Sequence, residues 1–217
     1  MRQPLSRRRL SAEFAALYVL APVTLAVFLP PSAMFPALFG VTALGLLLLH
    51  LTPGFHWREL FRGAGRIGWG HVAAVAVATA AVGYAVVQAT SPGSFLALPR
   101  RNPQLMLMIA TLYPVLSALP QEIVFRPLFF RRYGSLLPEG RGAQIALNAA
   151  VFSFAHLMYW SWIVAALTFA GGLAFAWSYR VRGNFPEAVV SHSVAGVILF
   201  ALGLGAFFYS GNVERPF

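Results

Sequence analysis

Glu122 lies in the interior of a long apolar run, and Arg126 follows it four residues later. On a helix these two side chains share one face, in the favourable order of acid before base. Ionisable groups at membrane depth are costly, are usually paired, and by default mark a functional site. The spacing therefore predicts a charge pair that either holds the fold together or takes part in a reaction.

Two histidines are also flanked by apolar sequence. Asn148, Phe152 and His156 follow one another at steps of four residues, which places them on one helical face. His192 is followed four residues later by Gly196, where another backbone or a substrate can approach closely. For either histidine alone, an interhelical hydrogen bond is the more ordinary explanation.

Together, one carboxylate and two imidazoles support two kinds of hydrolytic chemistry. A carboxylate with a neutral imidazole can hold and deprotonate a water molecule that attacks an amide. A second imidazole can then donate a hydrogen bond to the oxyanion. Glu122, His156 and His192 also match the ligand count of a hydrolytic zinc site with an open position. The HExxH spacing is absent, so a zinc site would need three separate helices.

The composition places these residues in a membrane. The chain is 59% hydrophobic and 10% charged, with a mean hydropathy of +0.70, which is typical of polytopic helical membrane proteins. It contains no Cys, which excludes disulfides, thiolate nucleophiles and Cys-ligated metals. The net charge of +10 comes from Arg residues that flank apolar runs, so we expect no nucleic-acid partner.

Seven apolar stretches have lengths near those that a bilayer requires. They are roughly Phe14–Leu29, Met34–Leu51, Val72–Thr90, Gln104–Phe130, Ala143–Trp160, Trp162–Tyr179 and Ala188–Tyr209. The fourth is too long for one straight span, and Pro114, Pro120 and Pro127 predict a kinked helix or a span followed by a tilted segment. The sequence therefore predicts an all-α transmembrane bundle, one domain over residues 1–217, with the motifs in residues 104–210.

The Arg residues also predict an orientation. With the N-terminus inside, the cytoplasmic loops hold Arg58, Arg62, Arg66, Arg131, Arg132, Arg141, Arg180 and Arg182. Arg100 and Arg101 fall on the opposite side, which leaves a clear majority inside. The basic segment Met1–Arg9 is interpreted as the flank of a retained first span rather than as a secretory signal. We predict a cytoplasmic N-terminus in a multi-pass protein of the bacterial inner membrane.

At these residues the sequence resembles the CPBP family, the CAAX protease and bacteriocin-processing (Abi) intramembrane endopeptidases. That family carries three short motifs in order on separate helices: EExxxR, FxxxH, and HxxxN or a variant. The corresponding segments here are Gln121–Arg126, Phe152–His156 and His192–Gly196. The resemblance extends over about residues 120–196, roughly the C-terminal half of the chain.

The resemblance implies a multi-helix membrane protease that cleaves a membrane-associated polypeptide near its C-terminus or leader. In the family, the glutamate motif and the FxxxH histidine activate water, and the last motif supports the oxyanion. We accordingly expect Glu122 and His156 to activate water, Arg126 to fix Glu122, and His192 to stabilise the oxyanion. The supporting residues would be Gln121, Arg126, Asn148, Phe152 and Gly196. Older descriptions of the family call its enzymes metal-dependent, and newer ones call them glutamic proteases. We expect no cofactor, with zinc on Glu122, His156 and His192 as the alternative.

Two residues depart from the family pattern. Gln121 stands where the first Glu, often assigned as the base, is usual, and Gly196 stands where an Asn is usual. A neutral amide cannot take a proton, which leaves Glu122 as the possible base of that motif. Three explanations stay open: Glu122 has taken over catalysis, a QE-type subfamily has its own geometry, or the protein is a non-cleaving relative.

Two other functions compete with the protease. A non-catalytic scaffold or immunity-type protein would keep the fold without the reaction. A small proton-coupled transporter would use Glu122 and the histidines as a relay, but such proteins usually contain internal repeats, and the sequence has none. The absence of Lys suggests a GC-rich bacterial genome, in which a peptide leader or C-terminal sorting segment is a more plausible substrate than a prenylated one.

Overall fold

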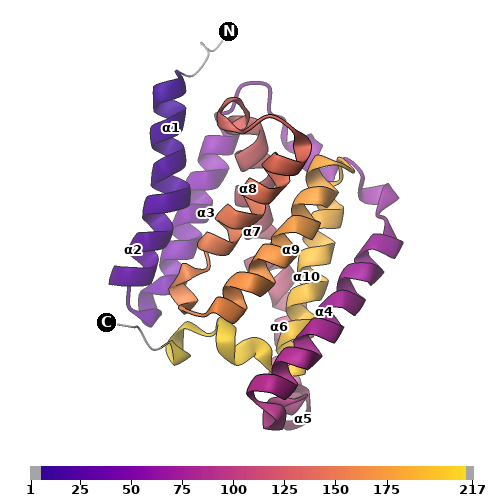
Figure 1. Ribbon diagram of the computed structural model, residues 1–217. Coiled ribbons are helices and arrows are strands. Elements are labelled where there is room, and N and C mark those ends of the chain that lie inside the picture. Colours follow the sequence, from indigo (N-terminus) through magenta and orange to yellow (C-terminus); the bar gives the residue numbers. More distant parts are fainter. Residues whose placement is uncertain (1–5, 214–217) are drawn as a thin grey trace.

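The computed structural model describes residues 6–213, which fold into helices joined by short turns and include no strand. The helices are α1 (Arg7–Ala15), α2 (Ala21–Phe28), α3 (Met34–His50), α4 (Trp69–Thr90), α5 (Ala97–Arg101), α6 (Pro103–Tyr113), α7 (Leu119–Ile123), α8 (Arg141–Phe154), α9 (Trp162–Arg180) and α10 (Phe185–Leu202). Most run side by side, and the short α5 lies at one end (Figure 1). The all-α prediction is confirmed; the start of Met1–Arg9 lies outside the described residues.

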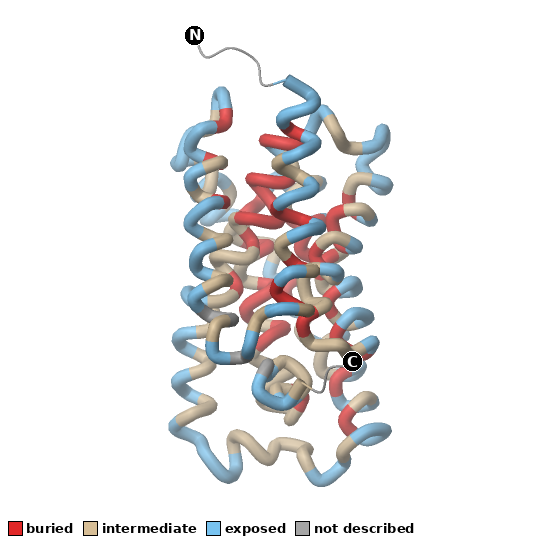
Figure 2. The backbone as a smooth tube through the Cα atoms, turned by 90° about the vertical axis from the view of Figure 1, so that its left-hand side faces the viewer, coloured by how far each residue is buried: buried red, intermediate tan, exposed pale blue. Residues whose placement is uncertain are grey.

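Five helical runs are long and apolar enough to cross a membrane. They are Arg7–Phe28, Trp69–Thr90, Pro103–Arg132, Trp162–Arg180 and Phe185–Leu202. The second and fifth predicted stretches also form helices, but α3 has 17 residues and α8 has 14. Buried residues concentrate in the interior of the bundle, while its outer faces are exposed (Figure 2). The number of spans and the cytoplasmic N-terminus stay predictions.

The segment Pro103–Arg132 is a single helical run that passes through two π-helical stretches, Pro114–Ala118 and Val124–Arg132. A proline has no N–H group and its ring clashes with the carbonyl four residues earlier. The wider π turns occur where Pro114 begins one stretch and Pro127 lies inside the other. The expected proline-interrupted segment is therefore present, and its backbone stays helical throughout.

Arg132 anchors the C-terminal end of this run, the end that the sequence predicts to be cytoplasmic. Its Nε and Nη2 donate to the two carboxylate oxygens of Glu13 at 2.7 and 3.1 Å. Its Nη1 donates to the Leu48 carbonyl at 3.1 Å. Further along, the hydroxyl of Tyr18 donates to the Val124 carbonyl at 2.7 Å. These bonds attach the first and third helices to the segment that carries the first motif.

The fifth predicted stretch, Ala143–Trp160, is not one helix. α8 ends at Phe154, a 3₁₀ turn covers Leu157–Tyr159, and Trp160 adopts a left-handed conformation with φ of 45°. The chain turns there and enters α9 (Figure 1). His156 consequently lies just beyond the end of α8 rather than inside a span.

Gly172 allows α9 to pack closely against α8. A Cβ atom added at Gly172 would lie 3.0 Å from the Ala149 Cα, which is backbone and cannot turn aside. We therefore expect Gly172→Ala to separate the helices and to destabilise the protein by about 1–3 kcal/mol. Thermal unfolding in detergent micelles measures this as a lower Tm. The control is Gly142→Ala in α8, where the new Cβ meets nothing within 4 Å; a Tm at Gly172→Ala equal to that control would contradict the packing argument.

Candidate functional site

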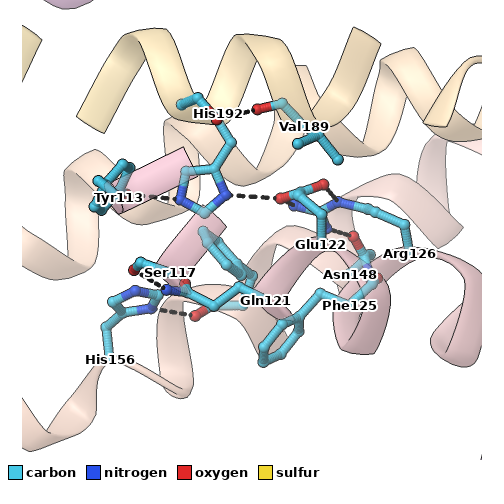
Figure 3. Close-up of polar contacts among 12 residues, drawn as sticks. Tyr113, Ser117, Gln121, Glu122, Phe125, Arg126, Asn148, His156, Val189 and His192 are labelled. Atoms are coloured by element: carbon cyan, nitrogen blue, oxygen red, sulfur yellow. Dashed lines mark hydrogen bonds and ion pairs between the residues drawn. The ribbon is translucent and has the colours of Figure 1, made fainter. Parts of the chain in front are cut away.

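Glu122 and Arg126 form the predicted ion pair, and both side chains are fully buried. The guanidinium Nε and Nη2 donate to the two carboxylate oxygens at 2.8 and 3.2 Å. Nη1 donates to Oδ1 of Asn148, whose Nδ2 donates in turn to the Phe125 carbonyl at 2.7 Å. The guanidinium also lies 5.1 Å from the ring centre of Phe152. The pair is thus saturated with partners from its own segment and from α8 (Figure 3).

His192, on α10, extends this network. Its Nδ1 lies 3.0 Å from Oε1 of Glu122, and its Nε2 lies 3.1 Å from the hydroxyl of Tyr113 on α6. The ring is stacked on Phe175 with centroids 4.8 Å apart. Because a carboxylate paired with Arg126 only accepts hydrogen bonds, Nδ1 carries the proton. In the neutral imidazole Nε2 then accepts from Tyr113.

His156 carries its proton on the same ring nitrogen as His192 but differs at the other nitrogen. Its Nδ1 lies 2.8 Å from the Phe152 carbonyl oxygen, which can only accept, so Nδ1 is the donor. In the neutral ring Nε2 is therefore the nitrogen with a free lone pair. Among the residues between 6 and 213, none makes a hydrogen bond to this Nε2. His156 thus presents a proton acceptor whose orientation is fixed by the end of α8.

His156 and His192 both line one cavity of about 500 Å³. Most of its lining is apolar, and its polar lining includes Tyr113, Ser117, Gln121, His156 and His192. Gln121 donates from Nε2 to the Ser117 hydroxyl at 2.9 Å, while its Oε1 is buried without a hydrogen-bond partner in the described part of the chain. Figure 3 shows the amide of Gln121 on the side of Ser117 and His156.

Comparison with known proteins assigns this part of the chain. Residues 102–198 match the family model described as Rce1-like, type II CAAX prenyl endopeptidase Rce1-like. This segment is similar to that family. The Rce1-like region runs from the start of α6 into α10 and contains all three motifs. No curated protein and no solved structure matches the chain.

Within the Rce1-like region the two adjacent residues of the first motif face different surroundings. Gln121 lines the cavity, whereas Glu122 does not line it and uses both oxygens on Arg126 and His192. Consecutive residues on a helix differ by about 100° in direction, and here that rotation places Gln121 at the cavity and Glu122 against Arg126 and His192. The sequence-based expectation that Glu122 activates water therefore does not fit where this carboxylate points (Figure 3).

The remaining predicted residues occupy positions around the same two groups. Asn148 and Phe152 contact Arg126, and Gly196 lines the cavity with His192. Sequence reasoning missed Tyr113 and Ser117. A signal was present, because Tyr113, Ser117 and Gln121 follow at steps of four residues and form a polar stripe in an otherwise apolar segment.

The Rce1-like region does not present the three-ligand zinc site considered from the sequence. No three His, Cys, Asp or Glu side chains within residues 6–213 come close enough to hold a metal ion. His192 points its two nitrogens at Glu122 and Tyr113. His156 instead fixes its ring on the Phe152 carbonyl. The donor set of Glu122, His156 and His192 thus does not fit a shared ion.

Proposed function

We propose that this chain is an intramembrane endopeptidase in which His156 is the general base. The observation that supports it is the free Nε2 acceptor of His156, fixed by the bond from Nδ1 to the Phe152 carbonyl and facing the cavity that Gln121 and His192 also line. A fixed neutral imidazole that lines a cavity together with other polar side chains is suited to remove a proton from water. The match of residues 102–198 to the Rce1-like family model supports peptide hydrolysis in a membrane.

The proposed reaction needs one water molecule. The Gln121 Oε1, a buried acceptor without a partner, accepts a hydrogen bond from the water, because such an acceptor is costly if left unpaired. His156 Nε2 removes the other proton while the water oxygen bonds to the peptide carbonyl carbon, and the carbonyl oxygen becomes an oxyanion. The His156 imidazolium then returns the proton to the amide nitrogen. The C–N bond breaks, and one carboxylic acid and one amine are released.

Glu122 and Arg126 act as positioning residues in this proposal. The carboxylate holds the Nδ1–H of His192 at 3.0 Å, as the acid of a catalytic triad orients its imidazole. Arg126 holds the carboxylate through two hydrogen bonds. The residues that touch the water in this proposal are then Gln121 and His156.

The substrate class follows from the cavity's surroundings. The lining is mostly apolar and is drawn from helices that include membrane-length runs. An apolar, extended segment of a membrane-associated polypeptide suits such a lining, with its scissile amide at the polar residues. A peptide leader or a C-terminal sorting segment, cleaved in a bacterial inner membrane, is the substrate we propose.

Replacing His156 tests the base directly. We expect His156→Ala to lower turnover by about 10²–10⁴-fold, because the other histidine in the cavity lining, His192, has both ring nitrogens bonded to Glu122 and Tyr113. The protein is reconstituted in nanodiscs with a library of apolar peptides in ¹⁸O-water, and mass spectrometry detects the label in new carboxyl groups. His56→Ala is the control, since that side chain is 78% exposed and should not affect turnover. Turnover unchanged in His156→Ala would reject His156 as the base.

A non-cleaving binding protein is the second candidate, and Gln121 is the observation that favours it. An amide cannot accept the proton that the family's first glutamate would take. This candidate predicts that the wild-type protein retains peptides from the library without placing ¹⁸O in any of them. The same assay therefore separates the two functions.

A further inference from the structure

Tyr113 is a polar residue of the cavity that lies outside the three motifs. Its hydroxyl lies 3.1 Å from Nε2 of His192, and its ring packs edge-on against His192 and Phe200 with centroid distances of 6.0 and 5.8 Å. It belongs to the same face of the helical run as Gln121, two steps of four residues away. Its hydroxyl is thus held at His192 by one hydrogen bond (Figure 3), and its ring is held by two aromatic contacts.

Gly196 makes room for this tyrosine. A Cβ atom at position 196 would overlap the Cε1, Cζ and hydroxyl oxygen of Tyr113. Any larger residue on α10 at this position, including the asparagine of the related motif, excludes the observed place of the ring. The glycine at 196 and the tyrosine at 113 therefore form one steric unit.

The hydrogen-bond directions decide whether His192 or Tyr113 can donate to a substrate. Glu122 occupies the Nδ1–H of His192, so the neutral imidazole has no second N–H group to offer. If His192 is protonated, its Nε2–H donates to the Tyr113 oxygen, which again leaves the phenolic O–H to donate elsewhere. Of these two groups, Tyr113 is therefore the one whose proton can reach the cavity that it lines: directly when His192 is protonated, and by turning away from His192 Nε2 when the imidazole is neutral.

We propose that Tyr113 is a catalytic residue that donates a hydrogen bond to the oxyanion and takes the place of the missing asparagine. The inference rests on the proposed peptidase function and names a group that the motifs do not contain. The O–H turns from His192 to the substrate oxygen as negative charge develops there, and the proton stays on tyrosine. His192, held by Glu122, is then the positioning residue that aims the hydroxyl.

Binding of a transition-state mimic tests the donor without requiring turnover. The probes are a phosphinate pseudopeptide with leucine and alanine beside the phosphinate, whose anionic oxygen represents the oxyanion, and its isosteric amide. We expect Tyr113→Phe to weaken phosphinate binding by about 10²–10³-fold while amide binding changes by less than about threefold. Calorimetry in nanodiscs measures both Kd values. Equal phosphinate affinity in wild type and Tyr113→Phe would overturn the proposal, as would a wild type that does not prefer the phosphinate.

A size exchange between positions 113 and 196 provides the second arm. Tyr113→Ala removes the donor, and Gly196→Asn displaces the tyrosine ring, so each alone should lose the phosphinate preference. The double variant has space for the asparagine amide and should recover at least tenfold of that preference. If Tyr113 only packs against Phe200, the double variant should not recover the phosphinate preference. A double variant with the wild-type Tm and no recovered preference would contradict the proposal that an asparagine at 196 can replace the tyrosine hydroxyl.

The two proposals can fail separately. If the wild-type protein prefers the phosphinate through Tyr113 but releases no ¹⁸O-labelled product, the oxyanion-binding site is supported and the peptidase function is rejected. If the wild-type protein cleaves peptides and Tyr113→Phe keeps full kcat and full phosphinate affinity, the peptidase function is supported and the proposed role of Tyr113 is rejected.

Discussion

Replacing Glu122 by alanine is expected to destabilise the protein by about 3–5 kcal/mol. The substitution leaves the Arg126 guanidinium fully buried without a counter-charge, since both side chains are 0% exposed. It also removes the acceptor of the His192 Nδ1–H at 3.0 Å. Breaking one partner of a buried pair costs far more than the pair contributes net, because the remaining charge is uncompensated.

Thermal unfolding in detergent micelles measures this loss, and the chain offers a matched control. Glu59 pairs with Arg131 near the surface, where the two side chains are 20% and 44% exposed. Solvent screening limits such a pair to about 1 kcal/mol or less, so Glu59→Ala should leave the Tm almost unchanged. If Glu122→Ala instead keeps the wild-type Tm and loses only turnover, Glu122 acts on water as the sequence alone suggested, and the positioning role is wrong.

The local chemistry of the site could be predicted from the sequence because it depends on short spacing. Glu122 and Arg126 are four residues apart, and their pairing follows from helix geometry alone. The same holds for Asn148 and Phe152, which reach the guanidinium from one face of α8. The apolar stretches likewise predicted where helices form, because bilayer length and composition decide that.

The rotation of each helix could not be predicted in the same way. The segment Pro103–Arg132 carries polar residues in two directions, the stripe that ends at Gln121 and the pair that begins at Glu122, so its sequence does not show which of the two turns to the cavity. The choice between Gln121 and Glu122 as the cavity-facing residue depends on such a rotation, and the π turns of the segment add to it. The partner that decides it, His192, is 70 residues away in the sequence. Only tertiary packing brings that histidine to Glu122 and leaves Gln121 beside the cavity.

The end of α8 shows a second limit. Steps of four residues placed His156 on the same helical face as Asn148, but the helix ends at Phe154. The imidazole still bonds to the carbonyl four residues earlier, at 2.8 Å. The spacing therefore gave the correct neighbour for a different reason: the ring caps a helix end, and its free nitrogen points away from that helix's own backbone.

Restoring a carboxylate at position 121 is expected to raise kcat by about 10²–10⁴-fold. Gln121 lines the cavity with His156, and its Oε1 is a buried acceptor without a partner. A glutamate of nearly the same shape keeps the acceptor and adds a group that can take the proton from water. The release of ¹⁸O-labelled carboxyl groups measures kcat for Gln121→Glu. Gln144→Glu is the matched control, since Gln144 bonds to Arg180 at 2.8 Å and does not line the cavity.

The size of this gain separates the open explanations for Gln121. A wild type with slow turnover and a faster Gln121→Glu variant supports His156 as a base that works without its carboxylate. A silent wild type and an active Gln121→Glu variant identifies a non-cleaving relative that one substitution returns to hydrolysis. A wild type as fast as Gln121→Glu, or faster, means that the amide is itself part of a distinct geometry, because a neutral side chain then serves the water as well as a base does.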